Sequence, residues 1–420
     1  MDEKIAIKAK KLIKLSNEHI CNHCLGRKFS DVLDGNDNVE RGKIIRNTLS
    51  IKDYDTEKSK CDVCENILLK IDEKISNESI LEKITEKIDY LDLKFDNFLV
   101  GSKIPKNILQ KDENLNETLE LDVENIKKEI NREIGKTLEN KLGKEVEFTN
   151  PDIVIMVDLR NLLISDEIKI RIQINPIFIE GRYLKLIRGI PQTKWPCRKC
   201  KGRGCKFCDF TGKMYKESVE ELISDVVLKH TNGREAKFHG AGREDIDVRM
   251  LGSGRPFVLE IKEPKIRELD LKRIAKEVNE YSSGKTEYND LKFTHRNRKA
   301  EIKVSSPDTF KVYRALVESD KDIFKEDLKK LQSLKIIEQQ TPQRVVHRRA
   351  DKIRIREVKE ITTKLINSKS FEMIIKGQGG LYIKELISSD DGRSKPSVSD
   401  KLGVKAICTQ LDVIEVGNDE

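Results

Sequence analysis

Hydrophobic residues recur every four positions near the end of the first third of the chain. These positions are Ile126, Ile130, Ile134, Leu138 and Leu142, and Gly143 follows directly. Such spacing is typical of one face of an amphipathic helix that stops at a glycine. A shorter, lysine-rich helix is predicted over residues 4–15.

Two apolar stretches after the long helix predict neighbouring strands. Residues 153–157 are continuously apolar, whereas residues 168–174 alternate isoleucine with polar side chains. Strict alternation indicates a strand with one buried face. A helix with paired strands in a segment of this size predicts a small domain that combines helices and a sheet.

The second half of the chain shows a longer series of elements. A strand is expected over 177–183, a helix over 219–230 that opens with the capping box Ser218–Glu221, and a helix over 271–281. Short strands then alternate with helices to the end. We therefore expect an α+β (mixed α/β) protein with a largely antiparallel sheet, divided into residues 1–70, 71–180 and 181–420.

Composition narrows the class further. The chain has 420 residues, of which 37% are charged, and a net charge of +8. No stretch approaches the roughly 18 apolar residues that cross a bilayer, and the N-terminus is too charged for a secretory signal. A cytoplasmic protein without membrane contact, acting as a monomer, is expected.

Eight of the nine cysteines form four Cys-x-x-Cys pairs. Without a secretory signal, this pattern favours metal binding over disulfides. Four thiolates complete a tetrahedral zinc site. For the two pairs near the N-terminus, an iron–sulfur cluster or free thiols are the alternatives, and for the two pairs around residue 200 the alternative is a flexible basic loop whose thiols remain free. The two expected zinc sites consist of Cys21, Cys24, Cys61 and Cys64, and of Cys197, Cys200, Cys205 and Cys208. The ninth, Cys408, is expected to be a packed core thiol.

Basic residues concentrate in two stretches, 344–356 and 295–299. Phosphate backbones are plausible targets for both, and a solvated strand face is the alternative. Net charge alone permits nucleic-acid binding without demanding it.

Residues 242–252 place two arginines and three carboxylates before an apolar run at 256–261. If this segment is extended, Asp245 and Asp247 share one side, which can enter a pocket, and Glu244 faces solvent or a structural partner on the other. Arg243 then lies close enough in sequence to help keep Asp245 ionised. An acidic turn bounded by glycines is the alternative.

The sequence Gly242-Arg243-Glu244-Asp245 resembles the catalytic loop of pseudouridine synthases, whose usual form is Gly-Arg-Thr-Asp. Its continuation through Phe257 resembles the archaeal-type tRNA pseudouridine synthase family that modifies the TΨC arm, at position 54, position 55 or both. Segments 190–196, 218–224, 340–351 and 379–385 agree with that family. The resemblance extends from the first cysteine pair nearly to the C-terminus.

This resemblance implies a zinc-binding N-terminal region, a THUMP-like RNA-binding domain and a C-terminal catalytic domain. It implies tRNA as partner, Asp245 as catalytic carboxylate and no organic cofactor, with Asp247 as the alternative carboxylate. Tyr313 would stack on uracil or relay a proton, Lys384 would hold the aspartate, and Tyr382 or Leu386 would line the pocket. The substrate-binding residues expected are Arg243, Tyr313, Arg348, Arg349, Tyr382 and Lys384.

Two other functions are compatible with parts of the pattern. A THUMP-containing methyltransferase or thiouridine synthetase needs a glycine-rich nucleotide loop, and Gly377-Gln-Gly-Gly380 lacks its spacing. A non-catalytic, zinc-dependent RNA-binding protein would keep the cysteines and basic stretches but would not need Asp245.

Overall fold

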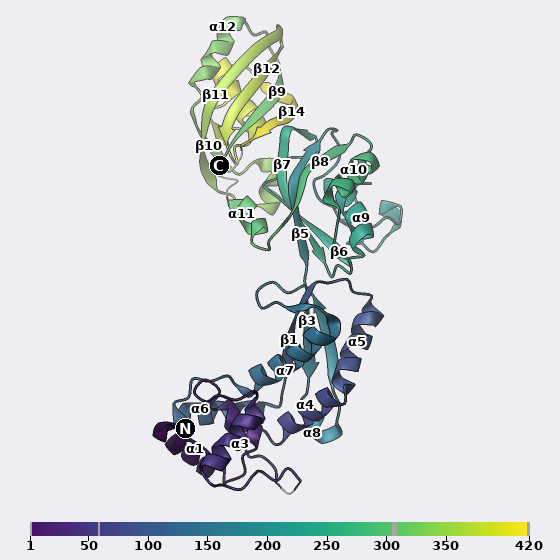
Figure 1. The fold of residues 1–420 in the computed structure, drawn as a ribbon. Helices are drawn as coiled ribbons and strands as arrows, with labels where there is room; N and C mark the ends of the chain where they lie inside the picture. The colour runs from purple at the N-terminus through teal and green to yellow at the C-terminus, as the bar shows by residue number, and fades with distance from the viewer. Residues whose placement is uncertain (1, 58, 305–308, 418–420) are drawn as a thin grey trace. The chain divides into compact units, whose positions relative to one another are not determined.

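The structure is a computed structural model that describes residues 2–57, 59–304 and 309–417. The chain divides into two compact units, Met1–Asn175 and Pro176–Glu420, and each unit has its own hydrophobic core (Figure 1). Both units combine helices with a mixed sheet, so the α+β class is confirmed. A further boundary at residue 70 stays a prediction, and the segments on both sides of it share one core.

The first unit opens with helices and continues with a sheet and its covering helices. Its elements are α1 (Glu3–Leu15), α2 (Asn22–Arg27), α3 (Asn38–Thr48), α4 (Ile67–Ser76), α5 (Ser79–Leu91), β1 (Asn97–Lys103), α6 (Lys106–Leu119), α7 (Ile126–Leu142), β2 (Glu145–Val146), β3 (Ile153–Asp158), α8 (Leu162–Ser165) and β4 (Lys169–Ile174).

The sheet of the first unit has the strand order β2-β1-β3-β4. Strand β1 pairs in parallel with β2 and β3, and β3 pairs antiparallel with β4. Helix α7 packs against β1 with the isoleucine face that the sequence predicts. Gly143 ends this helix with φ of 60°, a left-handed conformation that glycine adopts without a steric penalty.

A buried ion cluster joins α2 to α6 and α7. Arg27 and Lys28 lie 2.6 Å and 2.5 Å from Asp112, and all three side chains are fully buried. Arg27 also lies 2.9 Å from Glu129, and Asp112 accepts the backbone N–H of Ile126 at 2.9 Å. Burial alone would raise the pKa of Asp112, but the two cations outweigh it and lower that pKa.

The second unit carries the larger sheet. Its elements are β5 (Ile177–Lys185), η1 (Lys206–Cys208), α9 (Val219–Thr231), β6 (Glu235–Gly240), β7 (Val248–Lys262), α10 (Leu271–Ser282), β8 (Thr286–Thr294), α11 (Arg298–Val304), β9 (Phe310–Ser319), α12 (Lys325–Leu328), η2 (Lys329–Ser333), β10 (Ile336–Gln340), η3 (Gln343–Arg348), β11 (Ile353–Asn367), β12 (Ser370–Gln378), α13 (Ile383–Ser388), β13 (Ser394–Lys395), α14 (Val398–Leu402) and β14 (Ala406–Val416).

This sheet has ten strands within the described residues. Its order is β13-β10-β11-β12-β9-β14-β7-β5-β8, and β6 pairs with β7. Among these strands β14 and β7 form the parallel pair, and the other pairings are antiparallel. Strand β7 pairs with β14 through residues 248–250 and with β5 through residue 250 and residues 255–261, so it joins the two halves of the sheet. Helices α9 and α10 pack beside β6, β7 and β8 (Figure 1).

The local sequence signals of the second unit are confirmed closely. The strand expected over 177–183 is β5, and the helices expected over 219–230 and 271–281 are α9 and α10. Ser218 caps α9 by accepting the backbone N–H of Glu221 at 3.2 Å. The segment 242–252 is extended only from Val248 onward, because residues 246 and 247 form a turn before β7.

The described residues include no helix with both the length and the hydrophobicity that crossing a lipid bilayer requires.

Replacing Asp112 by alanine is expected to destabilise the first unit by about 3–5 kcal/mol, because two buried cations lose their carboxylate. Hydrogen exchange of the α6 and α7 amides, measured by mass spectrometry in the full chain, reports this change. Glu113→Ala, at an exposed position of the same helix, is the control and is expected to shift protection by less than about 0.5 kcal/mol. Equal protection of the α6 and α7 amides from exchange in Asp112→Ala and Glu113→Ala would contradict a stabilising role of the ion cluster.

Candidate functional site

A pocket of about 370 Å³ opens where the loop before β7 meets β9, β14 and the start of α13. Its size falls within the range of roughly 300–1,000 Å³ that is usual for ligand pockets. The side chain of Arg348 lies outside the described part of the chain. The other residues expected in the site all line this pocket, namely Arg243, Asp245, Tyr313, Arg349, Tyr382 and Lys384.

Two cations hold the carboxylate of Asp245. Arg344 Nη1 lies 2.8 Å and Lys384 Nζ lies 3.7 Å from Asp245 Oδ2. Lys384 also donates to both oxygens of Asp247, at 2.8 Å and 2.7 Å. Asp245 and Asp247 thus share the ammonium group of Lys384. The side chain of Asp245 is 31% exposed and that of Asp247 is 66% exposed, so Asp245 is the more enclosed carboxylate.

Arg344 links Asp245 to a second acidic group. Its Nε lies 2.6 Å from Oε1 of Glu385, which is buried at the start of α13. The guanidinium group is therefore fixed between two carboxylates. The sequence grouped Arg344 with the basic stretch 344–356 as a phosphate contact, whereas the structure places it in the pocket.

Aromatic side chains form part of the pocket wall. Tyr313 projects from β9 and is buried, which raises the pKa of its phenol to about 12. Tyr382 precedes α13, and its hydroxyl accepts a hydrogen bond of 2.7 Å from Arg349. Leu386, expected as an alternative to Tyr382, is fully buried in the core.

Arg243 lies over the ring of Trp195, 5.3 Å from its centroid, in a cation–π contact. Trp195 in turn meets Tyr215 edge-to-face at 5.5 Å. Within the described residues, Asp245 forms its ion pairs with Arg344 and Lys384. Arg243 therefore joins the pocket to the loop between β5 and α9.

A buried carboxylate lies directly beneath the pocket. Glu244 accepts hydrogen bonds from the Tyr183 hydroxyl at 2.8 Å and 3.0 Å. Arg255 Nε lies 3.0 Å and Lys185 Nζ lies 3.8 Å from the same carboxylate. The sequence predicted that Glu244 faces away from Asp245, toward solvent or a structural partner, and the structure shows a structural partner.

The groups around Glu244 also anchor the backbone of the loop that carries Asp245. Lys185 donates to the carbonyls of Asp245 at 2.9 Å and Ile246 at 3.2 Å. Arg255 donates to the carbonyl of Ala241 at 2.9 Å. Gln192 donates to the Tyr183 hydroxyl at 2.7 Å and to the carbonyl of Gly242 at 3.0 Å. These bonds fix the loop backbone on both sides of Asp245.

Sequence reasoning missed Lys311, which also lines the pocket. It precedes Tyr313 by two positions on β9, so period-two alternation places both side chains on one face. Burial, with Arg255 nearby, lowers the pKa of Lys311 to about 8 despite the opposing effect of Glu244. A lysine two positions before a suspected pocket tyrosine was the available signal.

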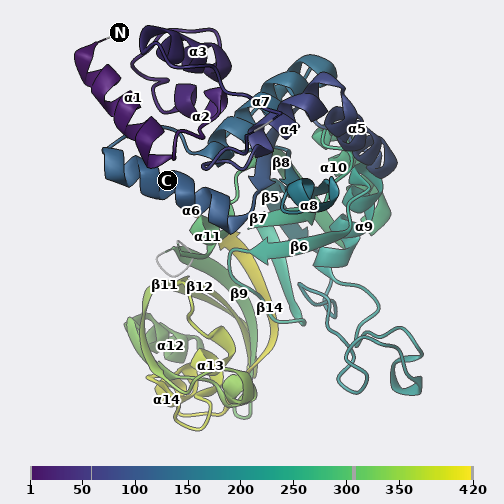
Figure 2. The ribbon, with the colours of Figure 1, turned by 90° about the horizontal axis from the view of Figure 1, so that it is seen from below.

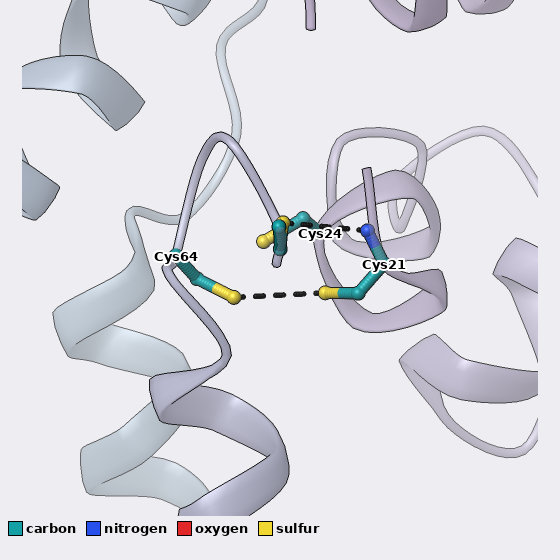
Figure 3. Close-up of side chains that lie close together, drawn as sticks. Cys21, Cys24 and Cys64 are labelled. Carbon is teal, nitrogen blue, oxygen red and sulfur yellow. Dashed lines mark hydrogen bonds between the residues drawn. The ribbon is translucent and has the colours of Figure 1, made fainter. Parts of the chain in front are cut away.

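The first cysteine set converges as expected for a metal centre. One sulfur from each of Cys21, Cys24, Cys61 and Cys64 lies within 4.8 Å of the others, and all four residues are buried. Figure 3 shows the thiols of Cys21 and Cys64 facing each other, at a separation of 3.6 Å. A tetrahedral zinc ion with bonds of about 2.3 Å needs sulfurs about 3.8 Å apart. The donor set therefore fits zinc. His23 faces Asp72 instead, at 2.6 Å.

The second cysteine set converges in the loop between β5 and α9. The sulfur separations are 3.9 Å for Cys197 and Cys205, 3.8 Å for Cys200 and Cys208, and 3.7 Å for Cys205 and Cys208. Backbone N–H groups of Gly204 and Gly212 donate to the sulfurs of Cys200 and Cys208 at 3.2 Å and 3.3 Å. Such donors stabilise thiolates, so this set fits a tetrahedral metal ion as well.

A pocket that gathers carboxylates, several cations and a buried tyrosine has the features of an enzyme active site. Comparison with known families then gives a direct assignment. Residues 178–417 match the family model described as Pus10, C-terminal, and residues 80–158 match the one described as Pus10 THUMP domain, archaeal. The chain belongs to the Pus10 family.

Individual relatives agree with this assignment. The tRNA pseudouridine synthase Pus10 of Methanothermobacter marburgensis is 52% identical over 406 residues, which is 97% of each chain. The protein of the same name from Methanosphaera stadtmanae is 46% identical over 411 residues, covering 95% of this chain and 96% of its own. A chain from the crystal structure of a Cbf5-Nop10-Gar1 complex aligns with 56% of this chain and 49% of its own, at 15% identity and a TM-score of 0.32. That likeness is too remote to bear on the assignment.

Replacing Lys311 by methionine is expected to remove a pH-dependent contribution to stability. The folded state releases the Lys311 proton near pH 8 and the unfolded state near 10.5. The unfolded state therefore binds more protons between these values, and wild-type stability rises with pH across that window. The stability of Lys311→Met relative to wild type is expected to fall by about 3 kcal/mol from pH 7 to pH 10.5.

Urea unfolding of the full chain measures this difference, because Trp195 is the single tryptophan and its fluorescence reports the second unit. Lys376→Met, at an exposed position of β12, is the matched control. If the free energy of unfolding varied with pH in the same way for wild type and Lys311→Met, the lowered pKa of Lys311 would be contradicted.

Proposed function

We propose that this chain isomerises uridine to pseudouridine in the TΨC arm of tRNA, at position 54, position 55 or both, with Asp245 as the catalytic carboxylate. The enclosed position of Asp245 between Arg344 and Lys384, at the wall that Tyr313 forms, is the observation that carries the proposal. The two relatives are named tRNA pseudouridine synthases, which supports the same activity. We expect the chain to act as a monomer in the cytoplasm.

The reaction rearranges atoms without adding or removing any. The bond between N1 of uracil and C1′ of ribose breaks, the ring turns, and C5 bonds to C1′. The proton displaced from C5 leaves and N1 gains one, so the overall composition is unchanged and no oxidant or reductant is needed. A carboxylate supports this sequence either by attacking the ribose or by accepting a proton, and both roles require an ionised aspartate.

The pocket supplies what an ionised aspartate needs. Arg344 and Lys384 stabilise the negative charge of Asp245, and the Glu385 contact keeps Arg344 oriented. Tyr313 offers a flat apolar surface against which the detached uracil can stack. A target uridine has to leave the stacked RNA to reach such a pocket. Arg349, near the pocket rim, suits a phosphate of that nucleotide.

Two structural zinc ions complete the proposal. Each would be held by one four-cysteine set and would add folding free energy without taking part in the reaction. The sulfur separations of 3.6 Å to 3.9 Å support this choice of metal.

Asp245→Asn is expected to lower pseudouridine formation by at least about 10³-fold, because it removes the charge and preserves the shape. The measurement is pseudouridine mapping after incubation of the pure chain with unmodified tRNA. Binding of tRNA by the variant is expected to stay within about threefold of wild type.

Asp247→Asn is the matched control, because it makes the same chemical change at the neighbouring carboxylate that Lys384 also contacts. We expect this variant to keep most of the activity. An inactive Asp247→Asn with an active Asp245→Asn would reverse the assignment. A wild-type chain that binds tRNA but forms no pseudouridine would favour an RNA-binding protein without catalysis.

The purified chain is expected to contain two zinc ions by elemental analysis. Replacing Cys61 and Cys64 together by serine is expected to remove one zinc ion and to destabilise the first unit, because metal binding is coupled to folding. Cys408→Ser, outside both sets, is expected to retain both ions. One zinc ion in the wild-type chain would contradict one of the two sites.

A further inference from the structure

One short loop carries a strong local excess of positive charge. Residues 194–216, named here the cysteine knuckle, contain eight basic residues and one acidic residue. The rest of the chain contains 73 basic and 72 acidic residues and is almost neutral. A zinc ion with four thiolates carries a net charge of −2, so the metal-bound knuckle keeps a charge of about +5.

The cations of the knuckle are available to a partner. The exposed ones are Lys194, Arg198, Lys199, Lys201, Arg203, Lys206 and Lys216. Lys213 is the exception, because Glu221 holds it at 2.8 Å. In the described residues, the ammonium and guanidinium groups of these seven form no ion pair within 4.0 Å, although the backbone N–H of Lys194 donates to Glu220 at 3.0 Å. Seven exposed cations within 23 residues therefore form a dense basic surface.

The knuckle is a firmly built projection. Its two ends are joined by hydrogen bonds of 2.7 Å from Cys197 N to the Gly212 carbonyl and 2.9 Å from Met214 N to the Trp195 carbonyl. Beyond this stalk, the four cysteine sulfurs bring the two halves of the loop to within 4.8 Å of each other. The loop extends beyond α9, away from the sheet of its unit (Figure 2). Its charges are thus held in a fixed arrangement and are not spread along a flexible chain.

Two exposed phenylalanines lie among these cations. Phe207 is 41% exposed, and its ring lies beneath Arg198 at 5.1 Å and Lys199 at 4.4 Å. Phe210 is 72% exposed and adopts φ of 58°, which is unfavourable for a bulky residue. Its backbone N–H donates to the Cys205 carbonyl at 2.9 Å, so the knuckle fold holds the ring outward.

We infer that the cysteine knuckle is a second RNA-binding surface, separate from the lining of the pocket. Its lysines and arginines bind phosphates of the substrate RNA, and Phe210 stacks on an unpaired base. Unpaired cations beside an exposed aromatic ring are the combination that single-stranded and looped RNA recognises. A protein partner would instead favour a larger apolar area with charges at its rim. The inference rests on the proposed function, since the RNA is the tRNA on which the pocket acts.

The test measures binding of an unmodified tRNA transcript to the full chain over a range of salt concentrations. The knuckle variant replaces Lys199, Lys201 and Lys206 by glutamine. The matched control replaces Lys321, Lys325 and Lys329, three exposed lysines near α12, in the same way. Zinc content and the thermal unfolding midpoint of both variants verify that the fold is kept.

The knuckle variant is expected to bind at least about tenfold more weakly at low salt, and to reduce the slope of log K against log salt by about 2 to 3. The control is expected to bind within twofold of wild type. Phe210→Ala is expected to weaken binding by about fivefold without changing the salt slope, because stacking releases no counterions, and Phe210→Tyr is expected to restore it.

Equal binding by wild type and the knuckle variant, or equal weakening by the control, would overturn the inference. RNA affinity and its salt dependence are measured without any pseudouridine being formed. A chain that forms no pseudouridine but loses RNA affinity in the knuckle variant would therefore refute the proposed function and retain the surface. A chain that forms pseudouridine, but whose RNA affinity is the same in wild type and in the knuckle variant, would support the proposed function and refute the second binding surface.

Discussion

The buried carboxylate of Glu244 is the constraint on which the pocket depends. An isolated carboxylate in a protein interior is strongly unfavourable, and here Arg255, Lys185 and the Tyr183 hydroxyl compensate it together. Both cations have further N–H groups, and these donate to backbone carbonyls of the loop that precedes β7. One buried charge therefore fixes the loop backbone, and the side chain of Asp245, next in sequence, is directed into the pocket.

Above this buried layer, charges of opposite sign alternate. Glu385 orients Arg344, Arg344 and Lys384 hold Asp245, and Lys384 also holds Asp247. Such an arrangement is set before any substrate arrives, so little reorganisation is needed when charge develops during a reaction. The same chain of contacts joins the loop before β7 to η3 and α13, segments that lie about 100 to 140 residues further along the sequence.

The two cysteine sets lie in different surroundings, although both fit the same metal. The first is buried within the core of its unit, next to the ion cluster of Arg27, Lys28 and Asp112 that ties α2 to α6 and α7. Its metal would stabilise a region that has a large hydrophobic core of its own. The second forms a small cluster apart from the main core of its unit and supports a loop of exposed cations. There a metal would replace the core that so short a loop lacks.

The sequence by itself determined the local elements, the two cysteine sets and most pocket residues. Periodicity placed α7 and Gly143, and motif resemblance placed Asp245, Tyr313 and Lys384, because such signals lie within short segments. Tertiary structure alone decided that Arg344 reaches Asp245, since in the sequence this residue resembled the other members of a basic stretch. It also decided the buried role of Glu244. Partners separated by tens of residues are chosen by strand order and packing, which no local pattern records.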